Sequence, residues 1–305
     1  CHMSLSSISR RHFIRNTSLA FGSLMLPLPK GPAKLSFSTL GCPDWDLPEI
    51  LVFAKKNGYQ GIELRGIKKD MVIPESPWMS ADMLGQTKDM IKQSGLKVVG
   101  LGSSAQLHHT EPATADKHLA EARQYIDLAA ALGCPNVRVY PEKLTEGGDK
   151  QATMKLIGER LLMLGDYAKA RKVNVLMETH GELLYAKDLE QVLSSARHSN
   201  VGIIWDVVNM WVKTKESPAS VYPILKPYIR HVHLKDMVWD GDKFNYVLFG
   251  KGVAPVREAI TALQNGGYKG FYSFEWEKRW HPEIAEPELA IGAFPQAFRS
   301  MTGTV

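Results

Sequence analysis

From residue 34 onward, short apolar runs alternate eight times with longer segments of helical pattern. The short runs are rich in Val, Ile, Phe and Tyr and are followed by polar residues, which predicts buried strands. The eight predicted strands comprise residues 34–39, 61–65, 96–102, 136–140, 173–178, 201–206, 229–234 and 270–275. Strands that alternate with helices form a parallel sheet, and eight such units close on themselves. The sequence therefore predicts an α/β protein with a single (β/α)8 TIM barrel.

Six of the intervening segments have clear helical patterns. They comprise residues 46–59, 81–95, 114–133, 154–172, 186–198 and 255–267. Several end in glycine, and we expect Gly58, Gly95, Gly133 and Gly266 to adopt the left-handed conformation that closes a helix. A doubly wound open sheet is the alternative topology. The first turn, residues 38–45, has no Gly-x-Gly-x-x-Gly motif, so nothing supports a dinucleotide site.

The first 33 residues differ in character from the rest and are interpreted as a leader, followed by the barrel domain at residues 34–305. The segment Ser9 to Arg15 contains paired arginines and resembles a twin-arginine export signal, which predicts a periplasmic location. The apolar stretch after it is too short to span a bilayer, so no stable membrane span is expected. A basic amphipathic helix packed on the barrel is the alternative. Cys1 and His2, which precede Met3, are interpreted as a remnant of expression.

The charge of the chain gives no support for a nucleic-acid partner. The formal net charge is +5, but the leader contributes four basic residues and no acidic ones. Without the leader, 33 basic residues stand against 32 acidic ones. A nucleic-acid-binding domain would show a clear basic excess.

Four residues of the kinds that bind metal ions stand at the ends of predicted strands: Glu178, Asp206, His233 and Glu275. The carboxyl ends of barrel strands converge on one rim, so these side chains can meet although they lie far apart in the sequence. The first three are separated by 28 and 27 residues, close to one strand-and-helix unit of about 30. The step to Glu275 is longer because a polar, Gly-rich insertion, residues 239–252, intervenes.

Five stretches together carry a resemblance to a known family: GYQGIEL, LMETHG, WDVVN, HVHLKD and GYKGFYSFEWE. They resemble the sugar phosphate isomerase/epimerase family of the xylose-isomerase-like barrel superfamily, which includes ketose 3-epimerases and inosose dehydratases. They occur in the family's order, and the resemblance that they carry extends over nearly all of residues 34–300. The resemblance implies that Glu178, Asp206, His233 and Glu275 hold one divalent metal ion.

Three carboxylates and an imidazole suit Mn²⁺ best, with Mg²⁺, Co²⁺ or Zn²⁺ as alternatives. A metal that binds the carbonyl and hydroxyl oxygens of a ketose acidifies the neighbouring C–H bond. The resemblance implies that Glu178 and Glu275 are the catalytic pair, which take a proton from one face of a cis-enediolate and return one to the other. Without the resemblance, these acids could simply be solvated residues at strand ends.

Five further residues are candidates for substrate binding. His180 and Lys235 follow Glu178 and His233 by two positions and share their inward parity. Asn209 stands where many relatives carry a histidine, and it can hydrogen-bond a sugar hydroxyl but cannot donate a proton as imidazolium does.

Arg65 and Arg138 lie at the second and fourth predicted strands. Together with Glu63, they would either contact substrate or form ion pairs with each other, and the sequence leaves both open. His231 lies deeper and is interpreted as a core histidine.

The sequence thus predicts a divalent-metal-dependent isomerase or epimerase of a keto-sugar or related polyol, acting through a metal-stabilised cis-enediolate. A keto-sugar dehydratase or lyase on the same metal site is the closest alternative, and a non-catalytic periplasmic sugar-binding protein is another. A DNA-repair endonuclease with the same fold uses a His-rich trinuclear zinc cluster, which Asn209 and the balanced charge disfavour. The expected partner is a small sugar, and the oligomeric state stays open.

Overall fold

The computed structural model describes residues 33–144 and 148–303. The leader predicted for residues 1–33 therefore lies, apart from Ala33, outside the described residues. Within the described residues, no helix is both long enough and apolar enough to cross a membrane.

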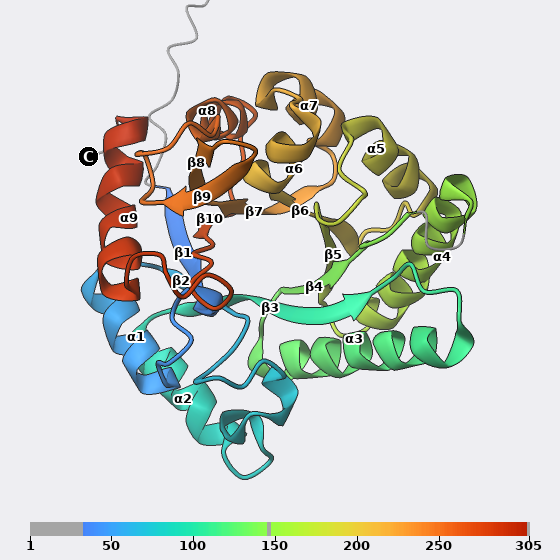
Figure 1. Cartoon of the computed structure of the whole chain (residues 1–305). Helices are drawn as coiled ribbons and strands as arrows, with labels where there is room; N and C mark the ends of the chain where they lie inside the picture. The colour runs from blue at the N-terminus through green and yellow to red at the C-terminus, as the bar shows by residue number, and fades with distance from the viewer. Residues whose placement is uncertain (1–32, 145–147, 304–305) are drawn as a thin grey trace, which may run out of the picture. The chain divides into compact units, whose positions relative to one another are not determined.

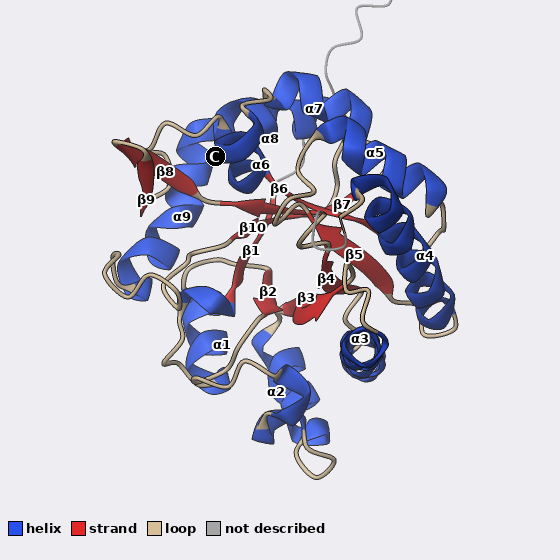
Figure 2. Ribbon diagram, turned by 45° about the vertical axis from the view of Figure 1, so that its right-hand side comes forward, coloured by secondary structure: helices blue, strands red, loops and turns tan. Residues whose placement is uncertain are grey.

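Eight parallel strands form a closed barrel, as predicted, with helices around its outside (Figures 1 and 2). Its strands are β1 (Lys34–Ser38), β2 (Gly61–Leu64), β3 (Lys97–Gln106), β4 (Asn136–Tyr140), β5 (Asn174–Glu178), β6 (Val201–Asp206), β7 (Ile229–Leu234) and β10 (Phe271–Phe274). Each strand pairs with its neighbours in chain order, and β10 closes the barrel between β7 and β1. The open-sheet alternative is wrong.

The helices of the described part are α1 (Leu47–Lys56), α2 (Leu84–Ser94), α3 (Pro112–Leu132), α4 (Lys150–Lys169), α5 (Ala186–Ser195), α6 (Val207–Thr214), α7 (Pro218–Leu225), α8 (Val256–Asn265) and α9 (Pro287–Thr302), with 3-10 turns at Thr39–Gly41, Ile73–Glu75 and Pro77–Met79. The six predicted helices are confirmed. The predictions missed α6, α7 and α9: the first two have only eight residues each, and α7 and α9 contain an interior proline.

Local side-chain chemistry fixes the helix ends. At the start of α1, the Asp46 carboxylate accepts from the backbone N–H of Glu49, whose own carboxylate accepts from that of Asp46. Gly58, Gly95 and Gly133 have the expected positive φ. The expectation for Gly266 is wrong: its φ is −76°, and the adjacent Gly267 has the left-handed φ of +80° instead. With two glycines in a row, the sequence pattern could not show which one adopts the left-handed conformation.

The insertion after β7 is a two-stranded antiparallel hairpin, β8 (Asp236–Asp240) and β9 (Lys243–Val247), which the sequence analysis did not predict. It lies on the side of the barrel that carries α8 and α9 (Figures 1 and 2). The Asp236 carboxylate anchors it by accepting from the backbone N–H groups of Met237, Gly250 and Gly252. A Cβ at Gly252 would lie 2.1 Å from Oδ1 of Asp236, so only glycine fits there.

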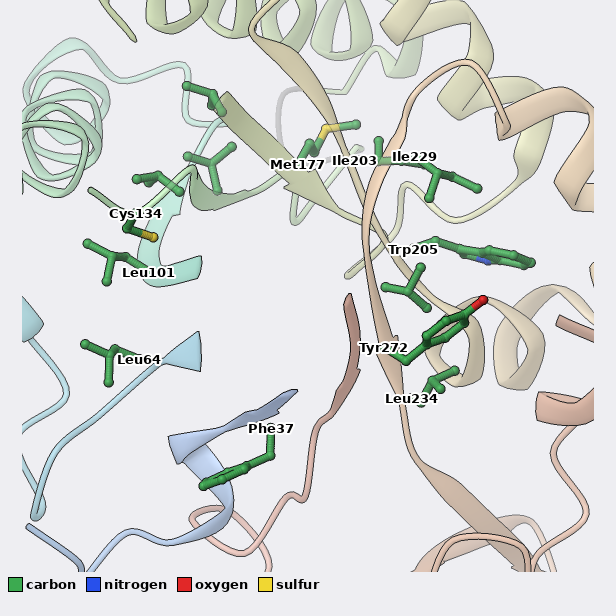
Figure 3. Close-up of a cluster of buried hydrophobic side chains, with 14 of the residues drawn as sticks. Phe37, Leu64, Leu101, Cys134, Met177, Ile203, Trp205, Ile229, Leu234 and Tyr272 are labelled. Atoms are coloured by element: carbon green, nitrogen blue, oxygen red, sulfur yellow. The ribbon is translucent and has the colours of Figure 1, made fainter. Parts of the chain in front are cut away.

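Alternation along the strands separates an apolar layer from a polar interior. One parity supplies buried apolar side chains, and Figure 3 shows members of this set such as Leu64, Met177 and Trp205. The other parity carries buried charged side chains, which contact one another across strands. They include Glu63, Arg138, Glu178, Asp206, His231 and His233. The barrel interior therefore holds the charged groups of the candidate site.

Candidate metal centre

The structure brings together the four residues predicted to hold a metal ion. Glu178, Asp206, His233 and Glu275 each offer a ligand atom, all within 4.8 Å of one another. The first three end or nearly end β5, β6 and β7, and Glu275 follows β10 directly. All four are buried, with exposed fractions of 2% or less. The sequence separation of up to 97 positions is bridged by closure of the barrel.

Asp206 is held in place by the strand-to-helix turn that it forms. It is the N-cap of α6, where its Oδ1 accepts from the backbone N–H of Asn209 at 2.8 Å. Its own backbone N–H donates at 2.9 Å to Oγ1 of Thr179, which directly follows the neighbouring strand β5. These bonds leave Oδ2 free to contact Nζ of Lys235, at 2.8 Å.

Two buried cations accompany the carboxylates. Nζ of Lys235 lies 2.8 Å from Oδ2 of Asp206 and 2.7 Å from Oε2 of Glu275. Nη1 of Arg138 lies 3.0 Å from Oε2 of Glu178 and 3.7 Å from Oε1 of Glu275. Buried carboxylates of like charge repel strongly, and these cations compensate the repulsion.

His233 uses both ring nitrogens. Its Nδ1 faces the carboxylates, 3.2 Å from Oε1 of Glu178 and 3.3 Å from Oε1 of Glu275. Its Nε2 faces Glu63, whose Oε2 lies 2.9 Å away. Oε2 of Glu63 also lies 2.9 Å from Nε2 of His231, so His231 is a core histidine with a carboxylate partner, as interpreted from the sequence.

The surroundings shift the protonation equilibria of these groups in opposite directions. Burial, with the added repulsion of Glu275 and Glu178, raises the pKa of Asp206 to about 7 although Lys235 opposes the shift. Burial would also raise the pKa of Glu275, but His233 and Lys235 hold it well below its usual value. Burial would lower the pKa of His233, and the surrounding glutamates raise it instead. The site thus favours the protonated form of Asp206 and the ionised form of Glu275.

The four residues fit a divalent metal ion. Oε2 of Glu178 and Oδ2 of Asp206 are buried and accept no hydrogen bond, although each has a cation within 3.0 Å. Buried polar atoms without such a bond are rare and call for an explanation. Three carboxylates and one imidazole form a donor set suited to Mn²⁺, Mg²⁺ or Zn²⁺. An ion among these oxygens would coordinate both atoms, which now contact only cations.

Comparison with known proteins identifies the family. The family model "Xylose isomerase-like TIM barrel" matches residues 51–298, most of the chain. The chain belongs to this family. None of the curated proteins searched matches it.

Three solved structures agree with the fold. The IOLI protein with a binding zinc atom is 17% identical, with a TM-score of 0.76 over 88% of this chain and 98% of that one. The D-psicose 3-epimerase with D-tagatose from Clostridium cellulolyticum H10 is 17% identical, with a TM-score of 0.70 over 89% and 99%. The probable 3-DHS dehydratase AsbF from Bacillus anthracis is 19% identical, with a TM-score of 0.70 over 86% and 98%. At these identities the likeness establishes the fold.

Of the five residues predicted to bind substrate, Lys235 and Arg138 contact carboxylates of the four-residue cluster directly. Asn209 borders the cluster through its backbone contact with Asp206. Nδ2 of Asn209 lies 3.5 Å from the carbonyl oxygen of Thr179. His180 is further out: its Nδ1 lies 2.9 Å from Oε1 of Glu142, and 40% of its side chain is exposed. Burial would lower the pKa of His180, but Glu142 and Glu178 raise it.

Arg65 makes other contacts than the ion pair with Glu63 that the sequence left open. Its Nη2 donates to Oγ of Ser104 at 3.0 Å, and its guanidinium group also approaches the carbonyl oxygen of Met71. Among the described residues, Arg65 forms no ion pair with Glu63, whose carboxylate is paired with two histidines instead. Arg138 is paired with Glu178. Substrate contact by Arg65 stays a prediction.

Sequence reasoning missed two groups at the site. Oε1 of Glu277 lies 2.6 Å from Nζ of Lys235, and the ring centroid of Tyr246 lies 5.7 Å from the same nitrogen. Glu277 follows Glu275 by two positions and shares its parity, a signal that the sequence contained. Tyr246 lies on β9, so it could not be placed without predicting the hairpin.

Proposed function

We propose that the chain is a divalent-metal-dependent isomerase or epimerase of a keto-sugar or related polyol, with Mn²⁺ as the preferred ion. One observation carries the proposal: two buried glutamates, Glu178 and Glu275, approach the same imidazole nitrogen and the same guanidinium group within a four-residue metal-type cluster. The similarity to a D-psicose 3-epimerase supports the same class of reaction.

The residues that would hold the ion are Glu178, Asp206, His233 and Glu275. When bound, a divalent ion supplies Lewis acidity, which polarises a substrate carbonyl and acidifies the adjacent C–H bond. The glutamates perform the proton transfer in this proposal. One takes the proton from the carbon next to the carbonyl, and the other returns a proton to the opposite face of the planar enediolate.

The nearby cations support the proposed proton transfer by the two glutamates. His233 and Lys235 favour the ionised form of Glu275, which is the form that a base requires. Arg138 is fully buried beside both glutamates, so its charge is poorly screened by water and stabilises negative charge that develops during the reaction.

A dehydratase or lyase is the second candidate, because the chain is also similar to the probable 3-DHS dehydratase AsbF. Elimination begins with the same proton abstraction beside a carbonyl. It differs afterwards, since the intermediate expels a hydroxyl or sugar group instead of taking up a proton on the other face.

Mass spectrometry in D₂O separates these reactions. The purified protein is loaded with Mn²⁺ and incubated with a panel of keto-sugars. An isomerase or epimerase yields an isomer that carries deuterium next to the carbonyl. A dehydratase or lyase yields a product lighter by one water or one sugar unit. Binding without exchange or mass loss across the panel would favour the sugar-binding protein and contradict the proposal.

A further inference from the structure

A third glutamate in the barrel interior, Glu63 on β2, contacts the candidate metal ligand His233 from behind. Glu63 is 1% exposed and is not one of the four predicted ligands. Its Oε1 and Oε2 lie 3.1 and 2.9 Å from Nε2 of His233. The opposite ring nitrogen, Nδ1, is the one that faces Glu178 and Glu275. Glu63 and the ligand cluster therefore lie on opposite sides of one imidazole ring.

Glu63 also contacts His231, two residues before His233 on β7. Oε2 of Glu63 lies 2.9 Å from Nε2 of His231, and the two imidazole rings are nearly perpendicular, at 82°. An ionised carboxylate only accepts hydrogen bonds, and it has enough lone pairs for both rings. Each histidine then presents an N–H at Nε2 to the same carboxylate. In His233, this arrangement leaves the lone pair of the neutral ring at Nδ1.

The barrel provides space for this carboxylate at one glycine. Gly100 on β3 lies opposite Glu63 in the strand register. A Cβ at Gly100 would lie 3.2 Å from Cγ of Glu63, closer than most real Cβ contacts. The absence of a side chain on β3 thus lets Glu63 extend across the interior to β7.

We propose that Glu63 is a positioning residue, which fixes the orientation and tautomer of His233 so that Nδ1 is the metal-binding nitrogen. This inference rests on the proposed metal-dependent function. A carboxylate behind a metal-binding histidine acts in this way in other metal sites, where its loss weakens metal binding by roughly 10- to 100-fold.

Glu63, His231 and His233 also offer ligand atoms that lie within 4.8 Å of one another, close enough to hold an ion of their own. The distances of 2.9 to 3.1 Å from the Glu63 oxygens to the two histidines are hydrogen-bond lengths, and direct bonds account for both oxygens of the carboxylate. The proposal therefore requires that no ion binds between Glu63 and the two histidines.

Zinc titration tests the role without measuring turnover. Glu63→Gln should bind Zn²⁺ roughly 10- to 100-fold more weakly than wild type, because a neutral amide is a weaker acceptor than a carboxylate and its –NH2 group can only donate. Its melting temperature without metal should fall, because a buried partner of two histidines loses its charge, so affinity is compared at a temperature where circular dichroism shows both proteins folded. Glu111→Gln makes the same change at an exposed helix cap and should leave Zn²⁺ affinity unchanged. Wild-type affinity in Glu63→Gln would overturn the proposal.

His233→Ala separates this inference from the proposed function. If His233→Ala binds Zn²⁺ as tightly as wild type, the metal site and the proposed function are both wrong. If His233→Ala loses Zn²⁺ while Glu63→Gln retains wild-type affinity, only the positioning role is wrong. A second Zn²⁺ per chain in wild type that disappears in His231→Asn would also overturn the positioning role.

Nitrogen NMR of the wild type keeps the test decisive even if Glu63→Gln does not fold. In the protein loaded with diamagnetic Zn²⁺, the long-range imidazole spectrum should show His233 protonated at Nε2 and not at Nδ1. A proton at Nδ1 with a bare Nε2 would overturn the proposal, because Glu63 would then have no N–H to accept from His233.

Discussion

The ammonium of Lys235 lies 2.8 Å from Oδ2 of Asp206, and both side chains are at most 1% exposed. The same ammonium lies 2.7 Å from Oε2 of Glu275. A buried cation therefore contacts two of the four carboxylate and imidazole side chains that are candidates for metal binding. Lys235 and a divalent ion stabilise the same negative charges, so each should affect the other's contribution to stability.

Replacing Lys235 with methionine should expose this dependence. Loss of one partner from a buried ion pair typically costs about 3–5 kcal/mol, because the other charge is left uncompensated. We expect the metal-free Lys235→Met protein to melt at a lower temperature than wild type, and added Mn²⁺ to raise its melting temperature by more than it raises that of wild type. Equal metal-induced shifts, measured by calorimetry, would show that Lys235 and the ion do not share these carboxylates.

Metal affinity should depend strongly on pH. Since the pKa of Asp206 is raised to about 7, its proton must leave before the carboxylate binds an ion. Affinity should fall at least about tenfold per pH unit below pH 7. The raised pKa of His233 extends the dependence to higher pH. Calorimetric titration at several pH values would measure this, and Asp206→Asn should show a flatter dependence. A flat wild-type profile between pH 5 and pH 7 would contradict the assignment.

The same group has the opposite effect on the metal-free fold. A carboxyl whose pKa is higher folded than unfolded binds its proton more tightly in the folded state. Its contribution to the free energy of unfolding is fully present below the usual value of 3.8, and it is lost as pH rises toward about 7. Asp206→Asn should remove this part of the pH dependence of unfolding in the metal-free protein.

Metal content tests the ligand set directly. His233→Ala should lose most of the bound divalent ion, because the imidazole is the one nitrogen donor among the four residues. The barrel should stay folded, since its apolar layer is formed by side chains of the other parity. Elemental analysis and circular dichroism of the purified variants would measure both. Undiminished metal in both His233→Ala and Asp206→Ala would rule out this site.

The alternation of apolar runs and helical segments was enough to predict the barrel, because eight buried strands have few other ways to satisfy their edges. The same pattern predicted the four-residue cluster, since Glu178, Asp206 and His233 occupy equivalent positions at successive strand ends. The sequence did not determine the partner of Glu63 inside the barrel. The sequence analysis considered substrate contact or ion pairs with Arg65 and Arg138, and the closed structure shows histidines on β7 as its partners instead, with Gly100 opposite Glu63.

The hairpin β8 and β9 shows a second limit. The first four residues of β9 alternate between polar and apolar, but those of β8 do not. The conformation of the hairpin also depends on the Asp236 carboxylate accepting from backbone N–H groups up to 18 positions away. Such a contact leaves no periodic signal in the sequence. Tyr246 was missed for this reason, whereas Glu277 was missed although its spacing from Glu275 was visible.

We propose that the leader directs export to the periplasm, and its paired arginines give the test. Changing Arg10 and Arg11 together to lysine preserves the charge but alters the motif that the export machinery reads. We expect the double variant to accumulate in the cytoplasm, as measured by fractionation and immunoblotting. Unchanged periplasmic delivery would favour the alternative of a basic helix packed on the barrel.

Proton exchange by Glu275 tests the central claim most directly. The Mn²⁺-loaded wild type and its nearly isosteric Glu275→Gln variant are each incubated in D₂O with the keto-sugar that the wild type labels fastest. Deuterium incorporation next to the carbonyl is then followed by mass spectrometry. Because glutamine has no basic oxygen of useful pKa, the variant should exchange roughly 10²- to 10⁴-fold more slowly. Equal exchange rates in the two proteins, at matched metal content, would contradict the proposed proton transfer.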